Sequence, residues 1–202
     1  MPARFKVLDS LRGIAAICVA LSHIHYPANI SALPIIANGG FFVTLFFVLS
    51  GFIIAGKYQN FLKCSDTRTY YAHTAEFLIL RFGRLYPLHA FIIICIFVFN
   101  YISYGNPLEN ESITSLLITL LLLNGMGIID GFGWNPPSWS VSTEFWAYLI
   151  FLLSLTIPFK NKTLGYFIVL AIGIGVLSQL DLSAPGPKYN LFYGCIAGFF
   201  TG

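Results

Sequence analysis

Long apolar runs follow one another along this chain and leave few charged residues between them. Of the 202 residues, 57% are hydrophobic and 9% are charged, whereas about 25% are charged in an average soluble domain. A soluble fold of this length has too little interior to bury so much apolar surface, so a water-soluble domain is excluded. The 11 basic residues nearly balance the 8 acidic ones, which excludes a strongly positive nucleic-acid-binding surface. The composition predicts an integral membrane protein in contact with the lipid bilayer.

At about 20 residues per membrane helix, the chain has room for six to seven spans. This predicts an all-α fold, a polytopic bundle of transmembrane helices in a single domain over 1–202. The apolar segments are residues 8–26, 40–56, 86–104, 112–129, 139–157 and 164–182, and a seventh begins near Asn190. The fourth segment is interrupted by Asn124, Gly125 and Gly127, and two readings stay open there, a full span and a broken half-span.

Basic residues predict the orientation. Arg4 and Lys6 precede the first segment, and the loop at 57–85 contains most of the other Lys and Arg residues. Because cytoplasmic loops are rich in Lys and Arg, the N-terminus and the 57–85 loop are expected in the cytoplasm. Two lysines after the fifth segment would then face the other side, unless 112–129 crosses only half of the membrane.

The first segment contains three ionisable residues, Asp9, Arg12 and His23. Arg12 and His23 are 11 residues apart, so in a helix they share one face at about 16 Å along the axis. Asp9 and Arg12 are at i,i+3 and can pair, either within a site or as an anchor at the headgroups. His23 is a candidate for proton transfer, because an imidazole titrates near neutral pH.

Two arginines, Arg81 and Arg84, lie at i,i+3 on a short helix that precedes Pro87. Pro87 is expected to open the third span. Paired guanidinium groups favour an anionic phosphate ligand, and the alternative is a pair of anchors that contact lipid headgroups. His89, one turn further on, could reach the same ligand.

The fifth segment contains a polar stripe, because Ser140, Glu144 and Tyr148 follow one another at i,i+4. A carboxylate in an apolar span either pairs with a basic residue on another helix or takes part in chemistry.

The second segment contains the small residues Gly40, Ser50, Gly51 and Gly56, and close helix packing is their expected role. No cluster of Cys and His has metal-ligand spacing, so no metal site is predicted.

Four segments together resemble the acyltransferase 3 family of membrane O-acyltransferases. They are LDSLRGIAAICVALSH, with ten residues between Arg12 and His23, FFVLSGF at 46–52, RFGRLYP at 81–87, and SWSVSTEFWAY at 138–148. The resemblance implies a family domain of about ten spans of about 20 residues each. Residues 1–202 are therefore expected to be its N-terminal and incomplete portion.

The resemblance implies that an acyl-CoA, acetyl-CoA above all, is the co-substrate on the cytoplasmic side, with no tightly bound cofactor. It implies a hydroxyl acceptor on a cell-surface carbohydrate or lipid-linked sugar, and a location in the bacterial inner membrane.

Site residues follow from the residues and the resemblance together. Catalytic roles are predicted for His23, Arg12 and Glu144, with His23 as general base or as covalent acyl carrier. Five residues are predicted to bind substrate or to hold the site: Asp9, Arg81, Arg84, Ser140 and Tyr148.

Two alternatives stay open. One is a small-molecule or polysaccharide transporter with a proton relay, for which two related halves with paired broken helices would be typical. The other is a fragment that keeps the site residues of the enzyme without turning over.

Overall fold

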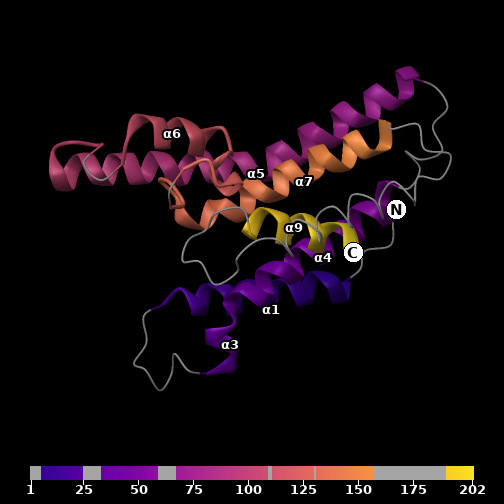
Figure 1. The fold of residues 1–202 in the computed structure, drawn as a ribbon, viewed down its shortest axis with the longest axis horizontal. Helices are drawn as coiled ribbons and strands as arrows, with labels where there is room; N and C mark the ends of the chain where they lie inside the picture. Colours follow the sequence, from indigo (N-terminus) through magenta and orange to yellow (C-terminus); the bar gives the residue numbers. More distant parts are fainter. Residues whose placement is uncertain (1–5, 25–32, 59–66, 109–110, 130, 157–189) are drawn as a thin grey trace.

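The computed structural model describes residues 6–24, 33–58, 67–108, 111–129, 131–156 and 190–202 (Figure 1). Every regular element in these ranges is helical, as the sequence predicted. The predicted segment at 164–182 lies outside the described residues. The helices are α1 (Lys6–Ser22), α3 (Pro34–Ala37), α4 (Gly39–Tyr58), α5 (Thr67–Tyr104), α6 (Ile113–Leu120), η2 (Asn124–Met126), η3 (Pro136–Ser138), α7 (Trp139–Thr156) and α9 (Asn190–Thr201).

Two of the described helices are long and apolar enough to cross a membrane, by length and composition: Gly39–Gly56 in α4 and Arg68–Tyr104 in α5. Shorter apolar helices cover Ser10–Ser22 and Phe192–Thr201. These helices agree with an integral membrane protein, and the total of six to seven spans stays a prediction.

Helix α5 differs from the prediction, because Pro87 lies inside it and does not open a new helix. The short arginine helix and the third span are one helix of 38 residues, which is about 57 Å long at 1.5 Å per residue. A proline in a helix interior costs about 3 kcal/mol, since it removes one backbone hydrogen bond and crowds the preceding turn. Pro87 is exposed, and α5 continues through it although a proline is more often found at a helix start.

Of the two readings that the sequence left open for the fourth segment, the structure shows the broken one. Helix α6 has 8 residues, or about 12 Å, so it is too short for a hydrocarbon core of about 30 Å. Ser112 caps its first turn by accepting a hydrogen bond from the Ser115 amide at 3.1 Å. Beyond its end, Leu122 has a φ of 55° and Gly127 a φ of 73°, both in the left-handed region that stops a helix.

Helix α4 packs between α1 and α9, and α7 packs on both α9 and α5 (Figure 1). Helix α4 approaches α9 closely at Gly51, where an added Cβ would meet the Phe199 backbone carbonyl. The packing role predicted for Gly51 is thus confirmed, whereas a Cβ on Gly40 would have no neighbour within 4 Å. The buried core at the meeting of α4, α5, α7 and α9 consists of Ile54, Phe77, Ala147, Tyr148, Phe151, Leu152, Ile196 and Phe199.

Candidate functional site

A hydrogen-bond chain joins three helices in the bundle. Arg12 on α1 donates from Nη2 to Ser50 Oγ on α4 at 3.3 Å. The Ser50 hydroxyl in turn donates to Glu144 Oε1 on α7 at 2.9 Å. Ser50 is 4% exposed, so these bonds lie where the surroundings screen charge poorly. Glu144 is therefore linked to a basic residue on another helix, and Ser50 is the link.

Tyr148 on α7 connects the hydrogen-bond chain to Arg81 on helix α5. The Tyr148 hydroxyl donates to Glu144 Oε1, so two of the three residues of the predicted stripe on α7 are bonded to each other. The guanidinium carbon of Arg81 lies 5.5 Å from the centre of the Tyr148 ring and 5.5 Å from that of Phe77, within cation–π range. Arg84 is exposed, and both guanidinium groups are near enough to interact electrostatically with the Tyr148 hydroxyl.

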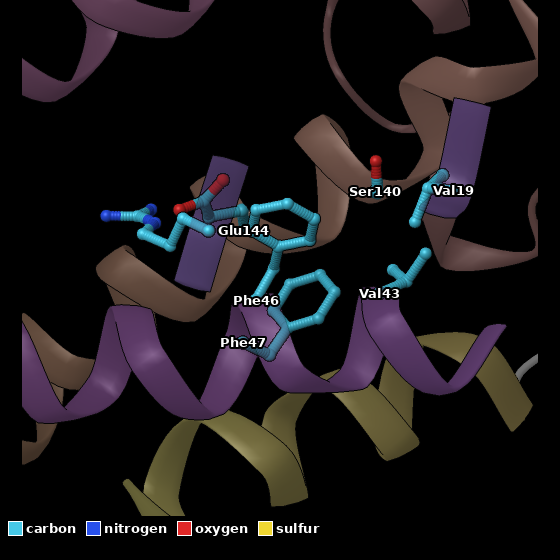
Figure 2. Close-up of a pocket in the computed structure, with 7 residues that line it drawn as sticks. Val19, Val43, Phe46, Phe47, Ser140 and Glu144 are labelled. Carbon is cyan, nitrogen blue, oxygen red and sulfur yellow. The ribbon is translucent and has the colours of Figure 1, made fainter. Parts of the chain in front are cut away.

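A pocket of about 140 Å³ lies beside the Arg12–Ser50–Glu144 chain. Its wall combines polar and apolar side chains from α1, α4 and α7: Arg12, Val19, Val43, Phe46, Phe47, Ser140 and Glu144. Figure 2 shows Val19 and Ser140 near one end of the pocket and Glu144 toward the other, with Phe46 between them. Along α1, the distance from Arg12 to Val19 is about 10 Å. The pocket thus has Glu144 toward one end, and an apolar and a polar side chain, Val19 and Ser140, near the other.

His23 lies outside this pocket wall. Helix α1 ends at Ser22, and His23 is exposed in the following turn. Its Nδ1 lies 2.8 Å from the Val19 carbonyl oxygen and 3.4 Å from Ser22 Oγ. Because a carbonyl only accepts, a neutral His23 in this arrangement has its proton on Nδ1 and a free lone pair on Nε2. The predicted face of Arg12 and His23 therefore extends past the pocket, with Val19 between the two residues.

Ser140 and Asp9 are the two remaining residues that were predicted to bind substrate or to hold the site. Ser140 lines the pocket, and its hydroxyl donates to the Pro137 carbonyl at 3.0 Å. The Asp9 side chain lies outside the described part of the chain, so its predicted pair with Arg12 stays a prediction.

His89 is bonded to the broken segment, and its expected reach to a ligand of the arginine pair stays a prediction. Its ring is 3% exposed, and Nε2 lies 2.9 Å from the Thr119 carbonyl at the end of α6. Figure 1 shows α6 running alongside α5, the helix that contains His89. His89 is thus bonded to the C-terminal end of α6.

A second stripe on α7 holds the broken segment, and sequence reasoning missed it. Ser142 donates to the Leu122 carbonyl at 2.6 Å and accepts from the Gly125 amide at 3.1 Å. Trp146 donates from Nε1 to the same Leu122 carbonyl at 2.8 Å. The serine and tryptophan at i,i+4 in the motif were a signal for this stripe. One face of α7 thus holds the strained turn, and the other presents Glu144 to the pocket.

Ser50 is the site residue that sequence reasoning assigned to another role. Its signal was a single hydroxyl in the apolar run FFVLSGF, where a polar side chain needs a partner.

These features define a helical membrane protein whose bundle encloses an Arg–Ser–Glu chain beside a small pocket. The chain belongs to the acyltransferase 3 family, because the model of that family, described as an acyltransferase domain, matches residues 5–202.

Two curated relatives extend this result. An acyltransferase named MdmB from Streptomyces mycarofaciens is 33% identical over 168 residues, which cover 76% of this chain and 40% of the relative. The peptidoglycan O-acetyltransferase OatA of Listeria monocytogenes is 29% identical over 204 residues, which cover 93% of this chain and 30% of the relative. The chain thus spans less than half the length of these relatives. No solved structure matches it.

Proposed function

We propose that this chain is the site-bearing part of a membrane O-acyltransferase, which moves an acyl group from acyl-CoA to a hydroxyl of a cell-surface carbohydrate or lipid-linked sugar. The observation that carries the proposal is the buried chain from Arg12 through Ser50 to Glu144, beside a pocket, in a member of an acyltransferase family. The printed name of the Listeria relative, a peptidoglycan O-acetyltransferase, supports a carbohydrate acceptor and an acetyl group.

The donor would bind at the cytoplasmic end of the bundle. Arg81 and Arg84 offer two guanidinium groups to the phosphates of coenzyme A, and such pairs bind phosphate through charge-assisted hydrogen bonds. The N-terminus would then lie in the cytoplasm, in keeping with the positive-inside rule, and the membrane would be the bacterial inner membrane.

The order of the polar residues along α7 supports separate entry routes for the donor and the acceptor. On α7, Tyr148, Glu144 and Ser140 follow one another over about 12 Å. Tyr148 contacts Arg81, whereas Ser140 lies at the pocket end near Val19, one turn before His23. The donor would therefore enter from the arginine end, and the acceptor hydroxyl from the His23 end.

The reaction then assigns a role to each group. The acceptor oxygen attacks the thioester carbon, a C–O bond forms and the C–S bond breaks. His23 Nε2 takes the hydroxyl proton and returns it to the leaving thiolate, so that an ester and free coenzyme A result. Arg12, about 16 Å from His23 along α1, orients the site, and Glu144 holds Arg12 through Ser50.

Replacing His23 by Ala in the full-length protein tests this role. Loss of a general base lowers the rate by about 100-fold or more, so acetyl transfer from acetyl-CoA to cell-wall glycan should fall by that factor in membranes that contain equal amounts of protein. His73→Ala is the matched control, because the His73 side chain is 50% exposed on α5. Undiminished transfer by His23→Ala would overturn the assignment.

A further inference from the structure

We infer that the surface groove between α5 and α7 binds the hydrocarbon chains of an anionic phospholipid, whose headgroup phosphate contacts Arg68. The inference concerns the outer surface of the bundle, and it stands or falls independently of the proposed reaction.

The groove has the size and the chemistry of a site for lipid chains. Its volume is about 440 Å³, and every side chain that lines it is apolar: Leu78, Ile79, Phe82 and Gly83 on α5, and Phe145 and Leu149 on α7. A cavity of about 150 Å³ holds the six carbon atoms of benzene, so the groove has room for about 18 carbon atoms. A polar ligand would lose its bonds to water here without gaining others. The groove therefore selects hydrocarbon.

Gly83 keeps the groove open. An added Cβ at this position would have no neighbour within 4 Å, so a larger side chain would project into open space and would not clash with the fold. The adjoining wall consists of packed aromatic rings. Phe82 stacks on Tyr86 with the ring centres 4.4 Å apart, and it meets Phe145 of α7 edge to face at 6.2 Å. The hollow is thus framed by side chains that hold one another in place.

A stripe on α5 connects the groove to Arg68. The residues Arg68, Ala72, Ala75, Ile79 and Phe82 follow one another at i, i+4, i+7, i+11 and i+14, so they share one face of the helix. All five are exposed. The two alanines are small, so a hydrocarbon chain can lie close to the helix between the arginine and the groove.

Arg68 lies at the depth of a lipid headgroup. The Tyr70 hydroxyl donates to the Leu152 carbonyl at 3.2 Å, so the start of α5 is level with the last turns of α7. Helix α7 has 18 residues, or about 27 Å, close to the hydrocarbon thickness of about 30 Å. Its last turns therefore lie near the headgroups. The distance along α5 from Arg68 to Leu78, where the groove begins, is about 15 Å, which is the depth of one lipid leaflet.

The charges around Arg68 favour an anionic headgroup. A guanidinium group binds phosphate through charge-assisted hydrogen bonds. Glu76 is the one carboxylate in the sequence of α5. It lies about 80° around the helix from Arg68, and its carboxylate is 3.8 Å from His73 Nδ1. Arg84 is about 160° away from Arg68, so these two arginines serve different faces of α5.

The test measures lipid binding to the full-length protein in detergent by native mass spectrometry, with dioleoyl phosphatidylglycerol or dioleoyl phosphatidylcholine added at equal concentrations. The wild type should bind phosphatidylglycerol about fivefold more tightly, which is the contribution of one arginine near an anionic lipid surface. Arg68→Gln should remove this preference and leave the binding of phosphatidylcholine unchanged. Gly83→Leu should weaken the binding of both lipids by about 10-fold or more, because the new side chain fills space that lipid carbons occupy.

Gly40→Leu is the matched control, because Gly40 is an exposed helical glycine on α4 and a Cβ there would also have no neighbour within 4 Å. Its lipid binding should equal that of the wild type. Elution as a single symmetric peak checks the fold of each variant, and Arg68→Gln decides the result if Gly83→Leu does not fold.

Three results would overturn the inference. One is equal binding of the two lipids by the wild type, and another is a preference for phosphatidylglycerol that persists in Arg68→Gln. The third is a wild-type dimer that Gly83→Leu converts to a monomer with unchanged lipid binding, because the groove would then hold a second copy of this chain.

Discussion

Ser50→Ala removes one oxygen atom, which links Arg12 to Glu144, and leaves the residues that line the pocket unchanged. The Ser50 hydroxyl accepts from Arg12 at 3.3 Å and donates to Glu144 at 2.9 Å. Without it, the two charged side chains lose their common partner in a buried position. A hydrogen bond to a charged group contributes about 1.5–3 kcal/mol, so the transition state should lose about that much. Since 1.4 kcal/mol is tenfold in rate, kcat/KM should fall by about 10- to 150-fold.

The assay measures kcat/KM for acyl transfer from acetyl-CoA, with the yield of monodisperse protein in detergent as the check on folding. Thr44→Ala is the matched control on the same helix, because the Thr44 hydroxyl is exposed and donates to the Gly40 carbonyl of its own helix at 3.3 Å. A surface change of this kind alters free energies by about 0.5 kcal/mol at most, so kcat/KM should stay within about twofold.

A double-mutant cycle decides whether Ser50 acts through Glu144. If Ser50 only holds the Glu144 carboxylate, then adding Ser50→Ala to Glu144→Gln should cost little beyond the loss already caused by Glu144→Gln. Fully additive losses would show that Ser50 works independently of Glu144. Unchanged activity in Ser50→Ala alone would refute the reasoning from the hydrogen-bond chain.

Two further predictions concern the packing of α4 on α9 and the hydrogen bond from Tyr148 to Glu144. Gly51→Ala should lower the free energy of unfolding by about 1–3 kcal/mol, because the new methyl group meets the Phe199 backbone. Thermal melting in detergent measures this loss. Gly40→Ala is the control and should melt like the wild type. Equal melting of both variants would contradict the close α4–α9 contact. Tyr148→Phe should lower kcat by about 10-fold, because it removes a hydrogen-bond donor to Glu144. The KM for acyl-CoA should stay unchanged, because the ring beneath Arg81 remains. A change confined to KM would instead assign Tyr148 to the binding of acyl-CoA.

Several features of the fold follow from local chemistry and were therefore predictable. The apolar runs predicted helices because backbone groups in lipid must be bonded within their own segment. Asn124 and Gly125 predicted the break after α6, and the i,i+4 spacing predicted the stripe of Ser140, Glu144 and Tyr148. The position of Pro87 was predicted wrongly, because a packed helix can continue through a proline that a local rule assigns to its start.

The sequence by itself determined the class of protein, its helical segments and the charged residues that need partners, because each depends on the cost of polar groups in lipid. Only the tertiary structure decided which partners they find. Ser50 and Glu144 are 94 residues apart, and their bond exists because α4 and α7 present those faces to each other. The same packing encloses the pocket beside Arg12 and leaves His23 one turn beyond Val19. The hydropathy of the sequence determines which segments lie in the membrane, whereas the packing of the helices determines which side chains are in contact.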